Sequence, residues 1–323
     1  MDRRSFLKSS AGALGVAAVS SFPILQTQAA KSAVSSETLV TTLYKSLNQN
    51  QRETIVFPFN DPLRKKVVNN WHITKPRVGK DFTADQQEMI RQIFLGIHSE
   101  EYAEAVLKQV AEDSEKKGLE DTSIALFGEP GEGKFEFVLT GRHVTRRCDG
   151  DSVEGAAFGG PIFYGHQSGP SFNEGPAHPG NIYWYQAKRA NELYTMLDGK
   201  QRKTALLGQG RKEQATKTVK LTGKNEDLPG IRASELSRDQ KRHLRKVVED
   251  VLMPFRQEDV SEAMNMIKKG GIDNLHLAFF KDQDLGNDGV WDVWQIEGPN
   301  MVMFFRGEPH VHAYLHIRDT IDA

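Results

Sequence analysis

Cysteine is almost absent from this sequence of 323 residues, because Cys148 is the only one. A single thiol excludes an intramolecular disulfide and any metal site built from several cysteine ligands. Charge of one sign is not in excess either: Lys and Arg number 42, Asp and Glu number 43, and the formal net charge is −1. Such a chain has no general electrostatic attraction for nucleic acid, so we expect no nucleic-acid partner.

Long apolar runs are missing after the first thirty residues, where no stretch approaches the roughly 20 apolar residues that cross a bilayer. The sequence also lacks a nucleophile elbow, an HExxH zinc motif, a dinucleotide-binding loop and an EF-hand loop. Gly128–Lys134 does match the glycine and lysine spacing of a phosphate loop. The next residue is Phe135 where Ser or Thr would hold magnesium, so the segment predicts a hairpin turn without a nucleotide.

The first thirty residues have the parts of an export signal. Arg3-Arg4-Ser-Phe-Leu-Lys8 is followed by an apolar run from Ala11 to Leu25 and by small residues near Ala29. This pattern predicts a twin-arginine-type signal peptide over residues 1–30, with the twin-arginine export machinery as partner. We expect an exported, periplasmic chain that has no membrane contact after cleavage; a disordered or membrane-anchoring N-terminus is the alternative. Because this route carries folded proteins, it favours a cofactor loaded before export.

The hydrophobic pattern predicts a single α+β domain over residues 31–323. N-terminal helices are expected between Ser36 and Gly118, one beginning with a capping box of Thr83 and Gln86. Asp61 is expected to cap another of these helices. Central antiparallel hairpin strands are expected at residues 123–128, 134–141 and 143–148, the second of them half-buried. A packed glycine-rich loop is expected at 152–182, and a polar surface segment at 208–227.

Further helices are expected at residues 185–197, 237–255 and 259–270, before a C-terminal antiparallel meander at 275–280, 290–296, 301–305 and 310–316. Three arginines near the third hairpin strand, Arg142, Arg146 and Arg147, are expected to form a charged surface. The order of elements therefore places helices and antiparallel strands in separate groups, as in α+β folds.

The last predicted strand carries the best candidate for chemistry. His310, His312 and His316, three of the ten histidines, alternate with apolar residues and so share one face of the strand. Imidazoles at positions i and i+2 lie about 6.5 Å apart along a strand and can share one ion. We therefore predict His310 and His312 as metal ligands and place His316 outside the ligand set.

At least one more ligand must come from another segment. His143 follows a short strand and His166 lies in the glycine-rich loop, and both are predicted to complete the site. His178 is a weaker candidate. Copper, iron and zinc each accept several imidazoles, and the sequence does not distinguish among them. A purely structural role for these histidines is the alternative.

The same residues resemble a known family. Phe135 to Thr145, with Gly141-Arg-His143, and Phe158-Gly-Gly-Pro-Ile-Phe163 are similar to segments of the family catalogued as domain of unknown function 3500. The ending from Trp294 through Pro309-His-Val-His312 is similar to the C-terminal strands of that family. The resemblance implies one domain over most of the chain and export, and it supplies no substrate. Many members have a second histidine where this chain has Arg142.

These observations lead to three functional hypotheses. The first is an exported protein with a mononuclear, histidine-ligated metal site, as in a metal-dependent oxidoreductase. The alternatives are a non-catalytic protein that binds a small-molecule ligand or a partner, and a metal-dependent hydrolase. The sequence does not decide whether the protein is an enzyme. The metal hypothesis fails if His143 lies more than about 10 Å from the His310 and His312 pair and no other ligand-type residue lies near the pair.

Overall fold

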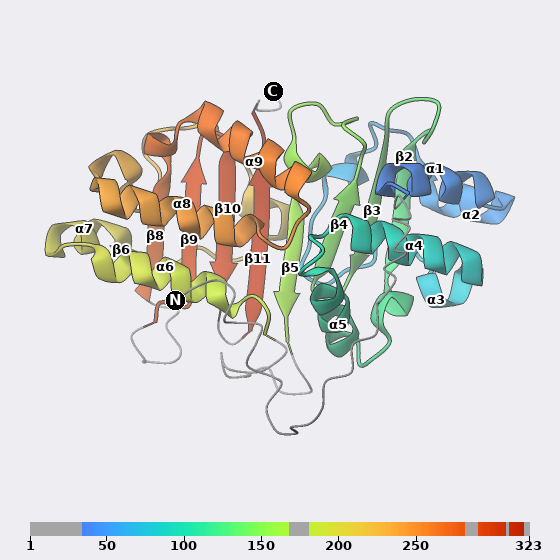
Figure 1. Ribbon diagram of the computed structural model, residues 1–323, viewed down its shortest axis with the longest axis horizontal. Helices are drawn as coiled ribbons and strands as arrows, with labels where there is room; N and C mark the ends of the chain where they lie inside the picture. The colour runs from blue at the N-terminus through green and yellow to red at the C-terminus, as the bar shows by residue number, and fades with distance from the viewer. Residues whose placement is uncertain (1–33, 168–180, 282–289, 308–309, 320–323) are drawn as a thin grey trace, which may run out of the picture. The chain divides into compact units, whose positions relative to one another are not determined.

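The computed structural model describes residues 34–167, 181–281, 290–307 and 310–319 (Figure 1). The predicted signal segment 1–30 and His178 lie outside the described residues. The described α-helices are α1 (Ser36–Ser46), α2 (Gln49–Ile55), α3 (Val78–Asp81), α4 (Ala84–Gly96), α5 (Ala103–Asp113), α6 (Trp184–Met196), α7 (Gly199–Ala205), α8 (Arg238–Leu252) and α9 (Gln257–Gly270). None of these described helices has the length and apolar character that a membrane crossing requires.

The described strands form one 11-stranded sheet: β1 (Val56–Phe57), β2 (Ser123–Gly128), β3 (Phe135–Gly141), β4 (Val144–Cys148), β5 (Ile162–His166), β6 (Leu206–Leu207), β7 (Ile231–Arg232), β8 (His276–Phe280), β9 (Val293–Gly298), β10 (Met301–Arg306) and β11 (Val311–Ile317). The order is β1-β2-β3-β4-β5-β11-β10-β9-β8-β6, and β7 pairs with β8. Only the end pairs β1–β2 and β6–β8 are parallel among these strands. The α+β prediction is confirmed, and β5 beside β11 joins the two strand groups.

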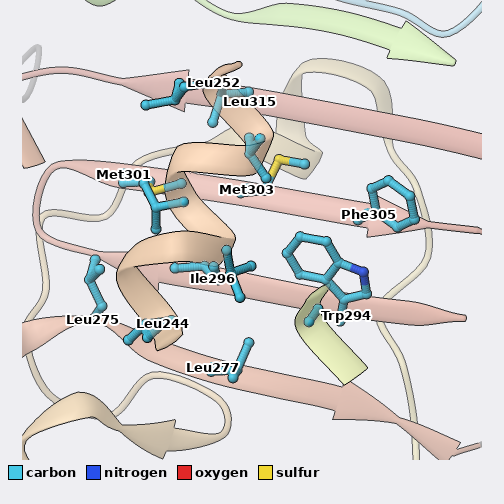
Figure 2. Packing of buried hydrophobic residues seen from close by; sticks show 14 of the residues in the cluster. Leu244, Leu252, Leu275, Leu277, Trp294, Ile296, Met301, Met303, Phe305 and Leu315 are labelled. Atoms are coloured by element: carbon cyan, nitrogen blue, oxygen red, sulfur yellow. The ribbon is translucent and has the colours of Figure 1, made fainter. Parts of the chain in front are cut away.

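Helices cover one face of this sheet. Helices α1, α4 and α5 share an apolar cluster with β2, β3 and β4, and α6, α8 and α9 share another with β8 to β11 (Figure 1). Figure 2 shows α8 crossing the strands, with Leu244 at the end towards Leu277 and Leu252 at the end towards Leu315. Trp294 is fully buried and stacks on Phe305 with ring centroids 5.0 Å apart. Each such side chain contributes about 1.5–3 kcal/mol by its burial.

The opposite face of the sheet is covered mainly by irregular segments. Val67 and Val219 pack there against Phe304 and Tyr314 of β10 and β11. The prediction of a half-buried strand at 134–141 is therefore wrong, because every residue of β3 is buried. The segment 208–227 is also not a simple surface loop. Its polar Thr216 bonds the backbone of Val67 at 3.0 and 3.2 Å, which lets a polar segment lie against a sheet.

The expected charged surface on β4 is likewise wrong, because Arg146 and Arg147 are 1% and 4% exposed. Strand alternation sends the two guanidinium groups to opposite faces. Arg147 contacts Glu136 at 2.5 Å, whereas Arg146 donates to the Phe163 carbonyl at 2.7 Å and to His98 Nε2 at 2.9 Å. Burial of both groups is tolerated because each one has several acceptors.

Several element boundaries differ from the pattern-based expectations. The capping box of Thr83 and Gln86 begins α4 as predicted. Asp61, however, caps only a 3₁₀ turn at Pro62–Lys65, and β5 lies inside the segment predicted as a glycine-rich loop. Ile162, Phe163 and Tyr164 favour a strand, but β5 is only five residues long and contains Gly165, so its pairing with β4 and β11 decides its conformation.

Asp149, directly after β4, makes stability depend on pH. Burial raises the pKa of its carboxyl from 3.8 to about 7, although Val153 N–H donates to it, and the negative charges of Glu136, Asp151 and Glu262 raise it further. The folded state therefore holds this proton more tightly than the unfolded state, and stability falls as pH rises from about 4 to about 7. Asn cannot ionise and still accepts the Val153 hydrogen bond. We expect Asp149→Asn to stabilise the chain by on the order of 2 kcal/mol at pH 8, under a ceiling of about 4 kcal/mol.

Urea unfolding of both proteins at pH 4 and pH 8 measures this effect. The gain should be small at pH 4, where Asp149 is protonated in the folded state and about half protonated in the unfolded state. An equal gain at both pH values would contradict the assignment, because it would reflect packing instead of ionisation.

Candidate metal centre

Three imidazoles converge where β5 and β11 join the two strand groups. His312 Nε2 lies 2.9 Å from His310 Nε2 and 3.1 Å from His143 Nε2. The three side chains form a buried group that could hold a metal ion, with one nitrogen from each within 4.8 Å of the others. Each residue is between 4% and 7% exposed. His143 thus lies well inside the 10 Å that the metal hypothesis requires.

Strand register places these histidines. His310 directly precedes β11, and His312 points to the sheet face opposite the helices, as alternation requires. In the ladders, His312 lies opposite Gly165 of β5 and opposite Arg306 of β10. The pair predicted from the i and i+2 spacing is therefore brought to one point by β11 alone.

His143 reaches the pair from a tight turn. The β3–β4 ladder pairs Gly141 with Val144, so Arg142 and His143 form a two-residue turn. The backbone of His143 has a φ of 56°, which is unusual for a residue with a side chain. Its N–H donates to the Asn69 carbonyl at 3.1 Å and its carbonyl accepts from Gly165 N–H at 3.2 Å. Backbone strain of this kind persists where surrounding contacts hold it, and it is frequent at functional sites.

Gly165 provides the space in which the strands and the imidazole meet. A methyl group at this position would lie 2.3 Å from the Val311 carbonyl oxygen and 3.3 Å from Cδ2 of His143. The backbone therefore comes close to the buried site at Gly165, whereas Gly159 and Gly160 lie beside β4 and its following turn. Only glycine allows the β5–β11 ladder and the His143 ring to coexist.

Asp113 orients His143 from the opposite side of the ring. Its carboxylate lies 3.0 Å from His143 Nδ1, 3.1 Å from His166 Nδ1 and 2.8 Å from the Gln167 N–H, and Gln109 Nε2 also donates to it. Burial alone would raise the pKa of Asp113, but hydrogen bonds from the two histidines hold it below its ordinary value. A carboxylate at the C-terminal end of α5 opposes the helix dipole, so these donors must compensate for it.

Glu213 orients the ring of His312 in the same way. One oxygen of Glu213 accepts from His312 Nδ1 at 2.8 Å, and the other is paired with Arg306 Nη1 at 3.0 Å. Burial raises the pKa of Glu213 despite the nearby Arg306 charge. Burial also lowers the pKa of His312 well below its ordinary value, and Arg306 and His143 lower it further. His312 is therefore neutral at neutral pH, which is the state that binds metals.

The two carboxylates decide where the ring protons are. If His143 and His312 each donate from Nδ1, as their contacts with Asp113 and Glu213 require, both Nε2 atoms carry a lone pair. These lone pairs face each other at 3.1 Å. Two imidazole nitrogens on one tetrahedral zinc ion would lie about 3.3 Å apart. The residues present therefore fit a metal ion with little movement.

The structure brings together three of the four predicted ligands. His166 lies outside the group of three and instead contacts Asp113 through Nδ1 at 3.1 Å, so it shares the carboxylate that orients His143. His316 lies further along β11, with Nδ1 3.1 Å from the Val219 carbonyl. Asp113 and Glu213 were missed by sequence reasoning, since a carboxylate on a helix or in a polar segment carries no local signal.

Comparison with known proteins identifies one family. A family model described as "Protein of unknown function (DUF3500)" matches residues 29–320. No curated protein matches the chain, and no solved structure does. The match spans the described helices and strands, including all three converging histidines.

Proposed function

We propose that this chain, which belongs to the DUF3500 family of proteins of unknown function, is a mononuclear metalloenzyme. His143, His310 and His312 would bind one transition-metal ion through Nε2. The observation that carries the proposal is the convergence of these nitrogens, with Nε2 of His143 and Nε2 of His312 3.1 Å apart. When both rings donate from Nδ1 to their carboxylates, the two Nε2 atoms carry buried lone pairs, and a cation bound between them relieves their repulsion.

The surroundings of the ring nitrogens support this proposal. Metal-binding histidines commonly donate their other N–H to a carboxylate, which fixes the tautomer and raises the basicity of the ligand. Asp113 serves His143 in this way and Glu213 serves His312. A purely structural histidine cluster would need neither the shared focus nor two separate buried carboxylates.

Three protein ligands favour catalysis over a structural role. Structural zinc sites are closed by four protein ligands, whereas catalytic sites keep one position open. The group found among the described residues has three members, all of them histidines. A divalent ion held by neutral ligands keeps its full charge and acts strongly on whatever occupies the open position. The same opening is where a small-molecule ligand would bind.

Among the reaction classes, we place a metal-dependent oxidoreductase first. A hydrolase of this type uses a carboxylate beside the bound water as general base. Among the residues that the structure describes, the carboxylates that contact the ligand histidines are Asp113 and Glu213, and both contact Nδ1 atoms on the far sides of the rings from the converging Nε2 atoms. Copper or iron, which imidazoles bind well, would supply the redox step from the ion itself.

Metal loading tests the proposal. The exported protein from its native host should contain about one copper, iron or zinc ion per chain by elemental analysis. After removal by a chelator, adding back the same metal should raise the unfolding free energy by about 2.7 kcal/mol when the free metal is 100 times the dissociation constant. Protein that carries no transition metal and shows no stabilisation with any of the three would overturn the proposal.

A further inference from the structure

We infer that Arg306 anchors an oxyanion, such as a carboxylate of the substrate, at the open side of the metal centre. The inference rests on the proposed function, because it concerns the group that shares the site with the ion. It is carried by one edge of the Arg306 guanidinium group, which points into the histidine cluster with hydrogen-bond donors left over.

The guanidinium group of Arg306 uses its two sides differently. Nη1 is paired with Glu213 at 3.0 Å. Nη2 lies 3.3 Å from His310 Nε2, and the buried Nε has no acceptor among the residues that the structure describes. Nε and Nη2 lie on the same edge of the planar group, so they form a pair of parallel donors.

Metal binding changes what this edge can contact. An ion held by His310 takes the Nε2 lone pair that Nη2 now faces. Both donors of the edge then lack an acceptor within the described cluster. A buried donor without an acceptor destabilises the protein, and more so when the group is charged. A ligand with two oxygens would satisfy both donors at once, as in bidentate pairs of arginine with carboxylate.

The net charge of the site also favours an anionic ligand. A divalent ion and Arg306 together would carry three positive charges, whereas Asp113 and Glu213, the two carboxylates that contact the ligand histidines, carry two negative charges. One positive charge then remains in excess beside the open position. Its side chain is 21% exposed, so the edge is partly accessible from solvent. A singly charged oxyanion would neutralise the site, and a neutral or cationic ligand would not.

Register holds Arg306 in this place. It is the last residue of β10 and lies opposite His312 in the β10–β11 ladder. A pairing role with Glu213 alone would need only the Nη1 side of the group. The second edge, directed at His310, is therefore available for ligand binding, and it stands beside the position where a metal-bound group would sit.

Cobalt-loaded full-length protein tests the inference, because the visible absorption of Co²⁺ responds to a new ligand. Acetate and inorganic phosphate are titrated separately, which distinguishes a carboxylate from a phosphate source of the same oxyanion chemistry. We expect a saturable spectral change with at least one of them in the wild-type protein. In Arg306→Gln the apparent dissociation constant should rise about 10-fold or more, as expected for loss of a bidentate charged pair.

Two further variants make the result specific. Arg306→Lys keeps the positive charge but lacks the pair of parallel donors, so this variant should also bind the anion several-fold more weakly. Full binding by this variant would overturn the bidentate contact. If Arg306→Gln does not fold, Arg306→Lys provides the test in its place. Arg318→Gln, a charge change beyond the end of β11, should leave binding unchanged.

The outcomes separate this inference from the proposed function. If the wild-type protein takes up cobalt but neither anion changes its spectrum, or if Arg306→Gln binds as well as the wild type, the inference fails and the metal site stands. If the protein takes up no metal at all, the proposed function itself fails.

Discussion

Replacing the two converging histidines His310 and His312, in a His310→Ala/His312→Ala variant, should lower the metal content from about one ion per chain to less than about a tenth. The variant removes two of the three converging ligands and leaves His143 alone. A single imidazole does not hold a transition metal against a chelator, because affinity depends on several ligands acting on one ion. Elemental analysis after dialysis against a mild chelator measures the loss.

A matched control comes from the same strand. His316 lies further along β11, with its Nδ1 near the Val219 carbonyl and not at the ligand cluster. A His316→Gln variant should therefore keep its metal. Equal metal content in the wild type and in the double variant would remove the metal assignment. If the double variant does not fold, as far-UV circular dichroism would show, the single variant His310→Asn answers the same question with a smaller change in volume.

A Gly165→Ala variant should lose both stability and metal. The added methyl group would lie 2.3 Å from the Val311 carbonyl oxygen, so β5 and β11 must move apart. Overpacking that displaces backbone typically destabilises a protein by 1–3 kcal/mol. We expect about 3 kcal/mol here, because the added methyl group and the carbonyl oxygen are both attached directly to the backbone. The same movement separates His143, held by β5, from His312 on β11. Metal affinity should therefore fall in the variant as well.

Urea unfolding and metal titration test this pair of effects, with Gly199→Ala as the control. Gly199 begins α7, and a methyl group there would meet nothing within 4 Å. Alanine in a helix is favoured over glycine by about 0.5–1 kcal/mol, so the control should be neutral or slightly stabilised. A Gly165→Ala protein with wild-type stability and metal affinity would show that the junction of β5 and β11 is not as tightly packed as the geometry requires.

Local sequence patterns were enough to predict many of the helices and strands. The apolar and polar alternation of β3 and the meander β8 to β11, and the capping box of α4, act within one segment, so they can be read without the rest of the chain. The same reasoning failed for β5, whose short sequence contains Gly165 and gains its conformation from two neighbouring strands. It also failed for Arg146 and Arg147, since the acceptors that allow their burial come from distant segments.

The histidine site shows what a local sequence pattern can predict and what it cannot. His310 and His312 could be predicted as ligands because a strand places residues i and i+2 on one face. His143 was a candidate among others, and only the tertiary structure chose it over His166. The choice depends on a turn with a φ of 56° and on a glycine opposite His312, neither of which a local pattern specifies. Export through residues 1–30 stays a prediction, since that segment lies outside the described residues.

The sequence by itself therefore determined the α+β class, most strands and the pair His310 and His312, because propensity and periodicity act over a few residues. The tertiary structure decided the third histidine, the carboxylates Asp113 and Glu213 that orient the rings, and the position of Arg306. These groups lie far apart along the chain, and their meeting depends on the pairing of β5 with β11 and on the packing of an irregular segment over the sheet. Long-range pairing of this kind has no local sequence signal, and it is what turns a histidine strand into a candidate metal centre.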